Sequence, residues 1–300
     1  MPWFTVRVPA SSANLGPGFD ALGMALDVYL TCRFRKSASL VIRAEGRDAA
    51  GIPTGPDNLI WQTAQAVAQS LSLDMPPIEL EIQNDIPLGK GMGSSAAALT
   101  AGVVIADQLL DLGWKPLRIL DEAARLEGHP DNVAACTLGS IVASAIDSGG
   151  VARAVRLELP QRFGVAIVVP DFDLPTVKAR AVLPASYSRE DAVFNVQRAA
   201  LLMAALSSGA TWAFPAALED RFHQPYRASL VPGLAEILKL RAPGLLGCVL
   251  SGAGPSILVF YERGYECVCD LVCQIFRFHG HASDVLHAGI ASRGFELHAE

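Results

Sequence analysis

The chain has 300 residues, 51% of them hydrophobic, which is enough for one large domain or two smaller ones with ample core. Its formal net charge of −6 argues against nucleic acid and anionic membrane surfaces as partners. Six cysteines without a Cys-x-x-Cys pair, no evident signal peptide and no apolar run of bilayer length indicate free thiols and a cytoplasmic protein.

The first half of the chain mixes strand and helix signals without a regular order. A strict alternation of apolar and polar residues marks its clearest strand, and Asn58 is a plausible cap for its first helix. In chain order we expect strands at 3–9 and within 21–43, a helix at 57–72, a strand at 78–82, helices at about 95–112 and 116–127, and a segment at 133–146 that is partly helical and then a strand.

The second half begins after the Ser148-Gly149-Gly150 turn. Here we expect strands at 151–159 and 164–169, helices at 189–207, 211–220 and 232–240, a strand at 257–261, a helix near 264–277 and a last strand near 283–297. Because strands and helices do not alternate regularly, the pattern favours an α+β fold, with a domain boundary near 150–160.

The most informative segment is Pro87–Ala97, a glycine loop that leads into a helix of small apolar residues. Three glycines at alternate positions precede two hydroxyl groups, in the order Gly89, Gly91, Gly93, Ser94, Ser95. Backbone N–H groups converge at such a helix start and attract anions, and glycine lets a phosphate approach the backbone. The spacing fits neither the Walker loop nor the dinucleotide fingerprint, so we expect a third kind of phosphate cradle. The alternative is an ordinary turn with a serine cap.

Two polar turns carry acidic groups. Asn14 and Asp20 lie six residues apart in a glycine-proline turn, where they could orient a small polar substrate or serve only as turn formers. Glu127, His129 and Asp131 lie at the end of the helix at 116–127 and just after it, and the carboxylates suit Mg²⁺ or an ammonium group. Taken alone, the second turn is better explained as a helix end with solvated polar residues.

A second glycine loop and two arginines complete the candidate groups. Residues 251–256 read Ser-Gly-Ala-Gly-Pro-Ser between apolar segments, which fits a binding loop or a tight hairpin. Arg180 and Arg227 could bind a carboxylate bidentately, although a single arginine is more often a surface residue. His279, His281 and His287 show no evident set of partner groups in the sequence, so we expect them to be solvated.

Together these segments resemble the GHMP kinase superfamily and, within it, the homoserine kinase family. The segments that carry the resemblance are 8–23, 87–97, 127–134, 220–227 and 250–256, with Met92 where leucine is commoner. The resemblance implies an ATP-dependent kinase that makes O-phospho-L-homoserine for threonine biosynthesis. It also implies a two-domain GHMP kinase fold: an N-terminal domain at 1–155 with a left-handed β-α-β feature, a ferredoxin-like domain at 156–300, and a homodimer.

The resemblance also implies roles for individual residues. The ATP phosphates would bind the loop Pro87, Leu88, Gly89, Lys90, Gly91, Met92, Gly93, Ser94, Ser95, Ala96 and Ala97. Asp20, Ser95 and Glu127 would be catalytic, with Ser95 and Glu127 as Mg²⁺ ligands. Homoserine would contact Asn14, Asp20, His129, Asp131, Thr176, Arg180, Arg227, Gly252 and Gly254. The arginines would take the α-carboxylate, Asp131 with Asn14 the ammonium group, and Asp20 the δ-hydroxyl.

Three alternatives stay open at this point. A related kinase for mevalonate or a sugar would use the same loop, but it would not need two arginines beside an acidic ammonium site. A catalytically silent nucleotide-binding protein would keep the fold without transferring phosphate. A structural module would use the glycine loops only as turns. The residues also leave open whether Asp20 or the phosphate takes the hydroxyl proton, and whether Lys90 helps to neutralise charge.

Overall fold

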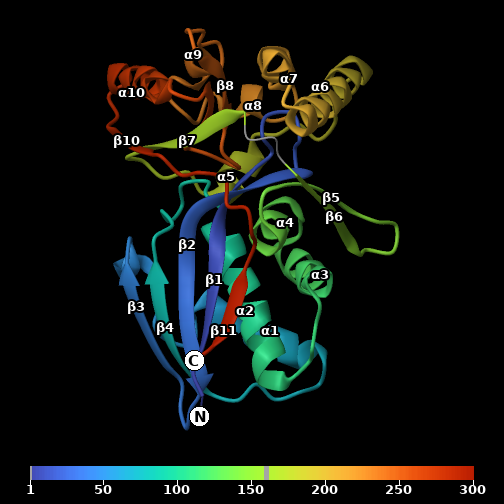
Figure 1. The fold of residues 1–300 in the computed structure, drawn as a ribbon, viewed down its shortest axis with the longest axis vertical. Helices are drawn as coiled ribbons and strands as arrows, with labels where there is room; N and C mark the ends of the chain where they lie inside the picture. Colours follow the sequence, from blue (N-terminus) through green and yellow to red (C-terminus); the bar gives the residue numbers. More distant parts are fainter. Residues whose placement is uncertain (1, 159–161) are drawn as a thin grey trace.

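The computed structural model describes residues 2–158 and 162–300, and Figure 1 shows two β-sheets with helices around them. The first half contributes strands β1 (Phe4–Ala13), β2 (Leu22–Lys36), β3 (Val41–Gly46), β4 (Ile78–Asn84), β5 (Ile141–Ile146) and β6 (Ala152–Leu157). Its helices are α1 (Leu59–Ser70), α2 (Ser94–Leu110), α3 (Pro116–Glu127) and α4 (Asp131–Leu138).

The second half contributes strands β7 (Phe163–Pro170), β8 (Leu245–Leu250), β9 (Ile257–Glu262), β10 (Ser283–Leu286) and β11 (Glu296–Ala299). Its helices are α5 (Thr176–Ala181), α6 (Arg189–Ser208), α7 (Phe214–Ala217), α8 (Gln224–Arg227), α9 (Leu234–Ile237) and α10 (Cys269–Phe278). Short 3-10 turns lie at Ala49–Gly51, Thr211–Ala213 and Glu266–Val268. The expected α+β class is confirmed.

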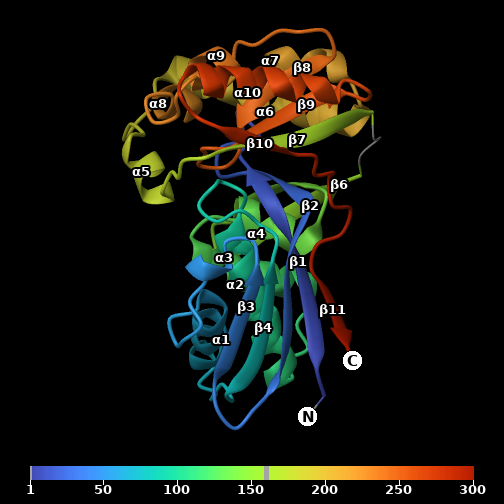
Figure 2. The same cartoon turned by 90° about the vertical axis from the view of Figure 1, so that its left-hand side faces the viewer.

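The larger sheet is built around β2, which pairs antiparallel with β1, β4 and β5. The strand order is β11-β1-β2-β4-β3, and β5 joins β6 to the same sheet. β3 and β4 run parallel and are joined through α1, which makes a β-α-β connection. Helices α1 to α4 cover one face of this sheet (Figure 2), with α2 and α4 in contact with β1. Small residues such as Ala101 and Gly102 let α2 lie buried between its neighbours.

The smaller sheet has the order β10-β7-β9-β8 and is antiparallel throughout. Both faces of β7 are buried, because alternate residues pack into two different clusters. Val165 and Ile167 belong to the main core, which also includes Leu202 and Phe214 from α6 and α7. Ala166 and Val168 face the other cluster, where α10 contributes its apolar side. This sheet therefore forms a central layer between helices.

The end of the chain links the two sheets. β10 pairs with β7, whereas β11 pairs with β1 and places Ala299 opposite Phe4. The last strand expected near 283–297 is therefore two strands in different sheets. The predicted domain boundary between residues 155 and 156 stays a prediction. In the structure β6 runs to Leu157, and β11 from the end of the chain belongs to the larger sheet. Residues 159–161, at the end of the strand expected at 151–159, lie outside the described residues.

Two helices of the second half are shorter than expected. The segment predicted at 211–220 is a 3-10 turn followed by α7, and the segment at 232–240 contains only the single turn of α9. Gly233 precedes α9 with a left-handed φ of 78°, so a regular helix cannot extend backwards through it. Among the described residues, no helix combines the length and apolar character needed to cross a membrane.

Candidate active site

The functional candidates meet in a pocket of about 150 Å³ where the two sheets approach each other. Its walls come from the turn after β1, the glycine loop before α2, the turn before α4, the segment around α5, α8 and the turn after β8. The predicted residues that line it are Asn14, Asp20, Gly89, Gly91, Met92, Gly93, Ser94, Ser95, Glu127, His129, Asp131, Thr176, Arg180, Arg227 and Gly252. A larger cavity of about 680 Å³ lies elsewhere, but it does not contain these residues.

Six predicted residues do not line the pocket: Pro87, Leu88, Lys90, Ala96, Ala97 and Gly254. Ala96 and Ala97 are buried in the main core, where they hold the first turn of α2 in place. The Leu88 N–H donates to Asp48 Oδ2 over 3.0 Å. These residues support the loop from outside the pocket.

Lys90 reaches away from the pocket. Its Nζ donates to the Phe172 carbonyl over 2.9 Å and lies 2.8 Å from Asp173 Oδ1. The lysine therefore ties the glycine loop to the second half of the chain. This geometry does not support a direct role for Lys90 in neutralising phosphate charge.

The glycine loop depends on backbone conformations that other residues rarely adopt. Gly89, Gly91 and Gly93 have φ angles of 67°, 75° and 66°. A Cβ atom at Gly91 would also collide with the carbonyl oxygens of Ser251 and Gly254. Glycine is therefore required at this position for both its φ angle and the close approach of the second glycine loop.

Hydrogen bonds from neighbouring segments hold the loop carbonyls. The Ser11 N–H donates to the Met92 carbonyl over 3.0 Å, and the Ser251 hydroxyl donates to the Gly91 carbonyl over 2.7 Å. α2 then begins at Ser94, where the first N–H groups of a helix have no partner within the helix. A helix start of this kind attracts an anion. The loop thus has the geometry of a phosphate site.

Ser95 and Glu127 form a hydroxyl–carboxylate pair at one side of the loop. Ser95 lies at the start of α2 and Glu127 at the end of α3, and the Ser95 hydroxyl donates to Glu127 Oε2 over 3.3 Å. Burial raises the pKa of the Glu127 carboxyl, and the charge of His129 opposes this effect. Paired oxygen donors with a buried negative charge fit a hard divalent cation such as Mg²⁺.

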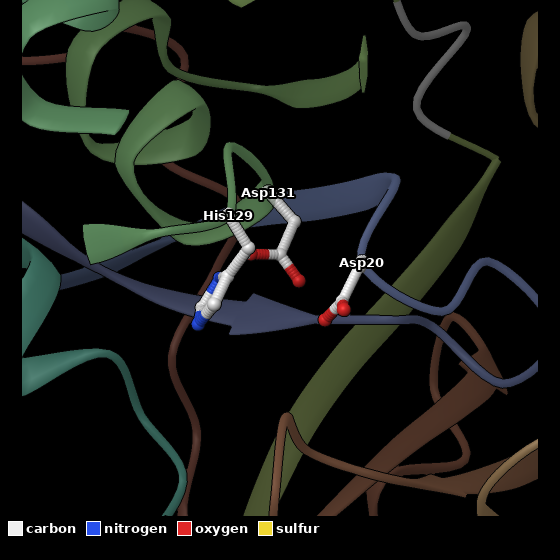
Figure 3. A group of neighbouring side chains, drawn as sticks. All are labelled: Asp20, His129 and Asp131. Atoms are coloured by element: carbon white, nitrogen blue, oxygen red, sulfur yellow. The ribbon is translucent and has the colours of Figure 1, made fainter. Parts of the chain in front are cut away.

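Asp20, His129 and Asp131 lie together beside this pair (Figure 3), with His129 Nε2 4.0 Å from Glu127 Oε1. A potential ligand atom of each lies within 4.8 Å of the others. His129 Nδ1 is 2.7 Å from Asp131 Oδ1, and that oxygen also accepts from the Asn132 N–H. Burial lowers the pKa of His129, but the hydrogen bond and charge of Asp131 outweigh it and hold the pKa above its ordinary value. The two carboxylates make this cluster suitable for a cationic group.

Arg180 binds Asp20 across the pocket. Its two terminal nitrogens lie 2.7 and 3.1 Å from the two carboxylate oxygens, which is a bidentate ion pair. Asn14 fixes the turn beneath this pair: its Oδ1 accepts from the Asp20 N–H over 3.0 Å, and its Nδ2 donates to the Gly252 carbonyl over 2.9 Å. The side-chain amide of Asn14 therefore joins the first turn to the second glycine loop.

Arg227 is buried and anchored by the protein itself. Its Nε donates to the Ala179 carbonyl over 3.0 Å, and Nη1 donates to the Gly252 carbonyl over 3.1 Å. Burial and the neighbouring charge of Arg180 lower the pKa of Arg227 to about 10, so the side chain remains charged at neutral pH. The two arginines differ in that Arg227 is held mainly by carbonyl oxygens and Arg180 by a carboxylate.

Sequence reasoning missed His223, which is fully buried behind Arg227. His223 Nδ1 accepts from Arg227 Nη1 over 2.9 Å, so its Nε2 carries the proton that is donated to the Gly16 carbonyl over 2.8 Å. Burial lowers the pKa of His223, in agreement with this neutral form. The segment 220–227 was noticed in the sequence, but nothing in it points to a partner more than 200 residues away.

Other supporting contacts were also missed. Ser11 Oγ donates to Asn132 Oδ1 over 2.9 Å and joins β1 to the start of α4. The sequence showed no partner groups for the C-terminal histidines, but two of them pair with carboxylates while they stay partly exposed. His279 Nε2 lies 2.9 Å from Glu236, and His281 Nδ1 lies 3.0 Å from Asp171. Both pairs lie near α10, outside the pocket.

Comparisons with known proteins agree with this architecture. Residues 58–140 match the family described as GHMP kinases N terminal domain, and residues 199–266 match GHMP kinases C terminal. A crystal structure of homoserine kinase from Cytophaga hutchinsonii has a TM-score of 0.86 at 28% identity, with 99% of this chain and 98% of that chain covered. Galactokinase from Lactococcus lactis, complexed with galactose, has a TM-score of 0.71 at 15% identity over 98% of this chain and 95% of its own, which shows a shared fold alone.

Two curated relatives define the family more narrowly. A homoserine kinase from Solibacter usitatus is 80% identical over 98% of this chain and 97% of its own length. A homoserine kinase from Deinococcus radiodurans is 46% identical over 87% of this chain and 85% of its own length. With near-complete coverage at such identity, the chain belongs to the homoserine kinase family of the GHMP kinases.

Proposed function

We propose that this protein transfers the γ-phosphoryl group of ATP to the side-chain hydroxyl of L-homoserine and forms O-phospho-L-homoserine, a step of threonine biosynthesis. Family membership supports a kinase that uses ATP. The observation that carries the proposal is the pocket itself, in which an anion-binding glycine loop faces two carboxylates and two arginines. A zwitterionic acceptor opposite a triphosphate needs this combination of charges.

The glycine loop is proposed to hold the triphosphate. Its carbonyl oxygens at Gly91 and Met92 are occupied by Ser251 and Ser11, which favours the loop N–H groups and the start of α2 as phosphate donors. These donors come from the backbone and need no side chain. The phosphates would therefore be held in one position while the acceptor binds beside them.

Ser95 and Glu127 are proposed to ligate Mg²⁺. Their oxygen atoms lie 3.3 Å apart next to the loop, which supports a shared hard cation. When bound, Mg²⁺ would neutralise negative charge on the β- and γ-phosphates. Burial of Glu127 strengthens its interaction with a cation, because the carboxylate has little water around it.

The acceptor is proposed to bind as a zwitterion. Asp131, with Asn14, would face the ammonium group, and Arg180 and Arg227 would face the α-carboxylate. Asp20 would then lie at the δ-hydroxyl. The compact cluster of Asp20, His129 and Asp131, with ligand atoms within 4.8 Å, supports the cationic end of this arrangement. Thr176, at the start of α5, also lines the pocket and would be a further contact.

The chemical step is an in-line displacement. The hydroxyl oxygen forms a bond to the γ-phosphorus, the bond from that phosphorus to the ADP oxygen breaks, and the hydroxyl proton passes to Asp20 or to the transferred phosphate. Such a reaction depends mainly on positioning and charge neutralisation. The Asn14 side chain accepts a hydrogen bond from the Asp20 N–H and so holds Asp20 in place, which supports a fixed position of its carboxylate relative to the acceptor.

The test is a coupled assay of purified protein with Mg-ATP and L-homoserine. We expect ADP release that depends on L-homoserine, and much lower rates with D-homoserine and L-serine. Mevalonate and galactose are assayed in the same way, because they are the acceptors expected for the alternative kinases of this fold. Phosphorylation of either one in preference to L-homoserine would refute the proposed substrate, and ATP binding without any transfer would refute the proposed activity.

We also propose that the protein acts in the cytoplasm as a homodimer. Val193 and Val196 on α6 are 50% and 67% exposed, and Trp212 just beyond this helix is 82% exposed. Exposed apolar groups of this kind are typical of protein–protein contacts. Light scattering after gel filtration should give about twice the monomer mass of 31.8 kDa, and the monomer mass would contradict the dimer. Cell fractionation tests the compartment.

A further inference from the structure

Arg180 holds the same carboxylate that the proposed reaction needs at the acceptor hydroxyl. Both of its terminal nitrogens bind Asp20, at 2.7 and 3.1 Å. An α-carboxylate that binds Arg180 has the same shape and charge as the Asp20 carboxylate, so the two groups compete for the same donors. The binding of a zwitterionic acceptor is therefore linked to the state of Asp20.

Arg227 does not take part in this exchange, although it is proposed to face the same α-carboxylate, because two of its nitrogens already donate to groups of the protein. Its Nε and Nη1 donate to the carbonyls of Ala179 and Gly252, and Nη1 also contacts His223. The Arg180 side chain is 38% exposed and extends from α5, a helix in which only Ala179 is buried. Figure 2 shows α5 at the edge of the molecule. Of these two arginines, Arg180 is the one free to exchange its partner.

Asp20 would remain in the pocket after such an exchange. Its backbone has a φ angle of 54°, and the Asn14 side chain holds its N–H. A carboxylate oxygen of Asp20 already lies within 4.8 Å of ligand atoms of His129 and Asp131. Figure 3 shows the Asp20 side chain directed toward this pair. The exchange therefore requires the Asp20 side chain to turn from Arg180 toward the acceptor while its backbone stays in place.

We propose that Arg180 is a specificity-determining residue that exchanges Asp20 for the α-carboxylate of the acceptor. This inference rests on the proposed function. The exchange replaces one bidentate ion pair by another, and the ammonium group of the acceptor adds a positive charge near the released Asp20. An acceptor without a carboxylate leaves Arg180 on Asp20 and is a poor substrate even when it is bound.

The test uses 3-aminopropan-1-ol, which is homoserine without its carboxylate. Wild-type protein and the Arg180→Gln variant are assayed with this alcohol and with L-homoserine. For L-homoserine we expect the variant to lose about 100-fold in kcat/KM, because a charged bidentate contact is gone. For 3-aminopropan-1-ol we expect kcat to rise by about 10-fold over wild type, because Asp20 is released permanently.

An arginine that only binds the carboxylate gives a different result. Such an arginine predicts the loss with L-homoserine but no gain with 3-aminopropan-1-ol. The exchange is therefore overturned if the variant phosphorylates 3-aminopropan-1-ol no faster than wild type does. This includes the case in which neither protein shows a detectable rate with this alcohol. Arg153→Gln is the matched control, because Arg153 is an exposed arginine that pairs with Asp147 outside the pocket. It should leave both acceptors unchanged.

A second measurement needs no variant of Arg180. In protein with ¹³C-labelled aspartate, the Asp20 carboxyl resonance is identified by its loss in Asp20→Asn. We expect saturating L-homoserine to shift this resonance and 3-aminopropan-1-ol to leave it near its starting position. Equal shifts with both ligands would overturn the exchange. If wild type does not phosphorylate L-homoserine at all, the proposed function fails; if it does and the alcohol result is negative, only the exchange fails.

Discussion

The two sides of the pocket are built by different means. The proposed phosphate side is a short continuous segment that offers backbone N–H groups, with glycines at φ angles of 67°, 75° and 66°. The acceptor side consists of charged side chains from four separate segments: the turn after β1, the turn before α4, α5 and α8. The first side depends on local conformation, and the second depends on how distant segments pack together.

This difference implies that substitutions on the two sides change different kinetic parameters. A change of backbone conformation in the loop should lower kcat/KM for ATP. A change of charge among the acceptor residues should lower kcat/KM for homoserine and leave the KM for ATP unchanged. Each prediction below tests that separation, and the expected effects become smaller from one to the next.

The largest effect is expected for Asp20→Asn on the acceptor side. The amide keeps the size of the side chain but cannot take a proton and binds Arg180 more weakly. We expect kcat/KM for homoserine to fall by about 100-fold to 10,000-fold, with the KM for ATP within about twofold of wild type. A fall in kcat at unchanged homoserine affinity identifies Asp20 as the base, and a fall in affinity alone assigns it to binding. A comparable rise in the KM for ATP would contradict the separation.

Gly91→Ala tests the phosphate side. The new Cβ would meet carbonyl oxygens of the second glycine loop at a φ angle of 75°, so the phosphate loop must shift. We expect kcat/KM for ATP to fall by about 100-fold, since a misplacement of about 1 Å is enough for such a loss. Steady-state kinetics with varied ATP measures it.

Gly113→Ala is the matched control for this substitution. Gly113 has a similar φ angle of 66°, but among the described residues no neighbouring atom lies within 4 Å of its Cβ position. It should lower the free energy of unfolding by about 1 kcal/mol and leave the kinetics unchanged. If Gly91→Ala behaves in the same way, the backbone of the loop does not bind the phosphates.

A smaller effect is expected for His223, which positions Arg227. His223→Leu removes the acceptor for Arg227 Nη1, and the KM for homoserine should rise by about 10-fold with little change in kcat. His223→Asn keeps an acceptor near the Nδ1 position and should recover part of this loss. Equal KM values for the two variants would show that the hydrogen bond to Arg227 is not the cause.

The smallest effect is expected for Lys90→Met. The lysine lies in the phosphate loop but pairs with Asp173 and the Phe172 carbonyl. Removal of such a partly exposed pair should change kcat and the KM for ATP by less than about threefold. A loss near 100-fold would show that Lys90 reaches the phosphates during the reaction.

The sequence predicted the features that depend on neighbouring residues. The helix at 116–127 coincides with α3, because Pro116 starts it and Gly128, with a φ angle of 89°, ends it. The strand at 78–82 lies within β4, where alternate residues are buried. The unusual backbone of the glycine loop could be predicted for the same reason, because its three glycines have the positive φ angles that glycine favours.

The features that depend on distant residues could not be read from the sequence in the same way. The contact of His223 with Gly16 spans more than 200 positions, and neither residue has a local pattern that reveals the other. The pairing of β11 with β1 joins the two ends of the chain, and the contact of Lys90 with Asp173 could not be predicted because Asp173 lies in the other half. The acceptor side was assigned by resemblance to a family, since isolated arginines and carboxylates carry little positional information.

The most direct test of the account is a crystal structure with Mg²⁺, a non-hydrolysable ATP analogue and L-homoserine. We expect phosphate oxygens about 3 Å from backbone nitrogens of residues 91–95, with the acceptor hydroxyl between the γ-phosphate and Asp20. A nucleotide whose phosphates lie elsewhere, with the loop N–H groups directed away from them, would contradict the proposed division of the pocket into a backbone side for phosphate and a side-chain side for the acceptor.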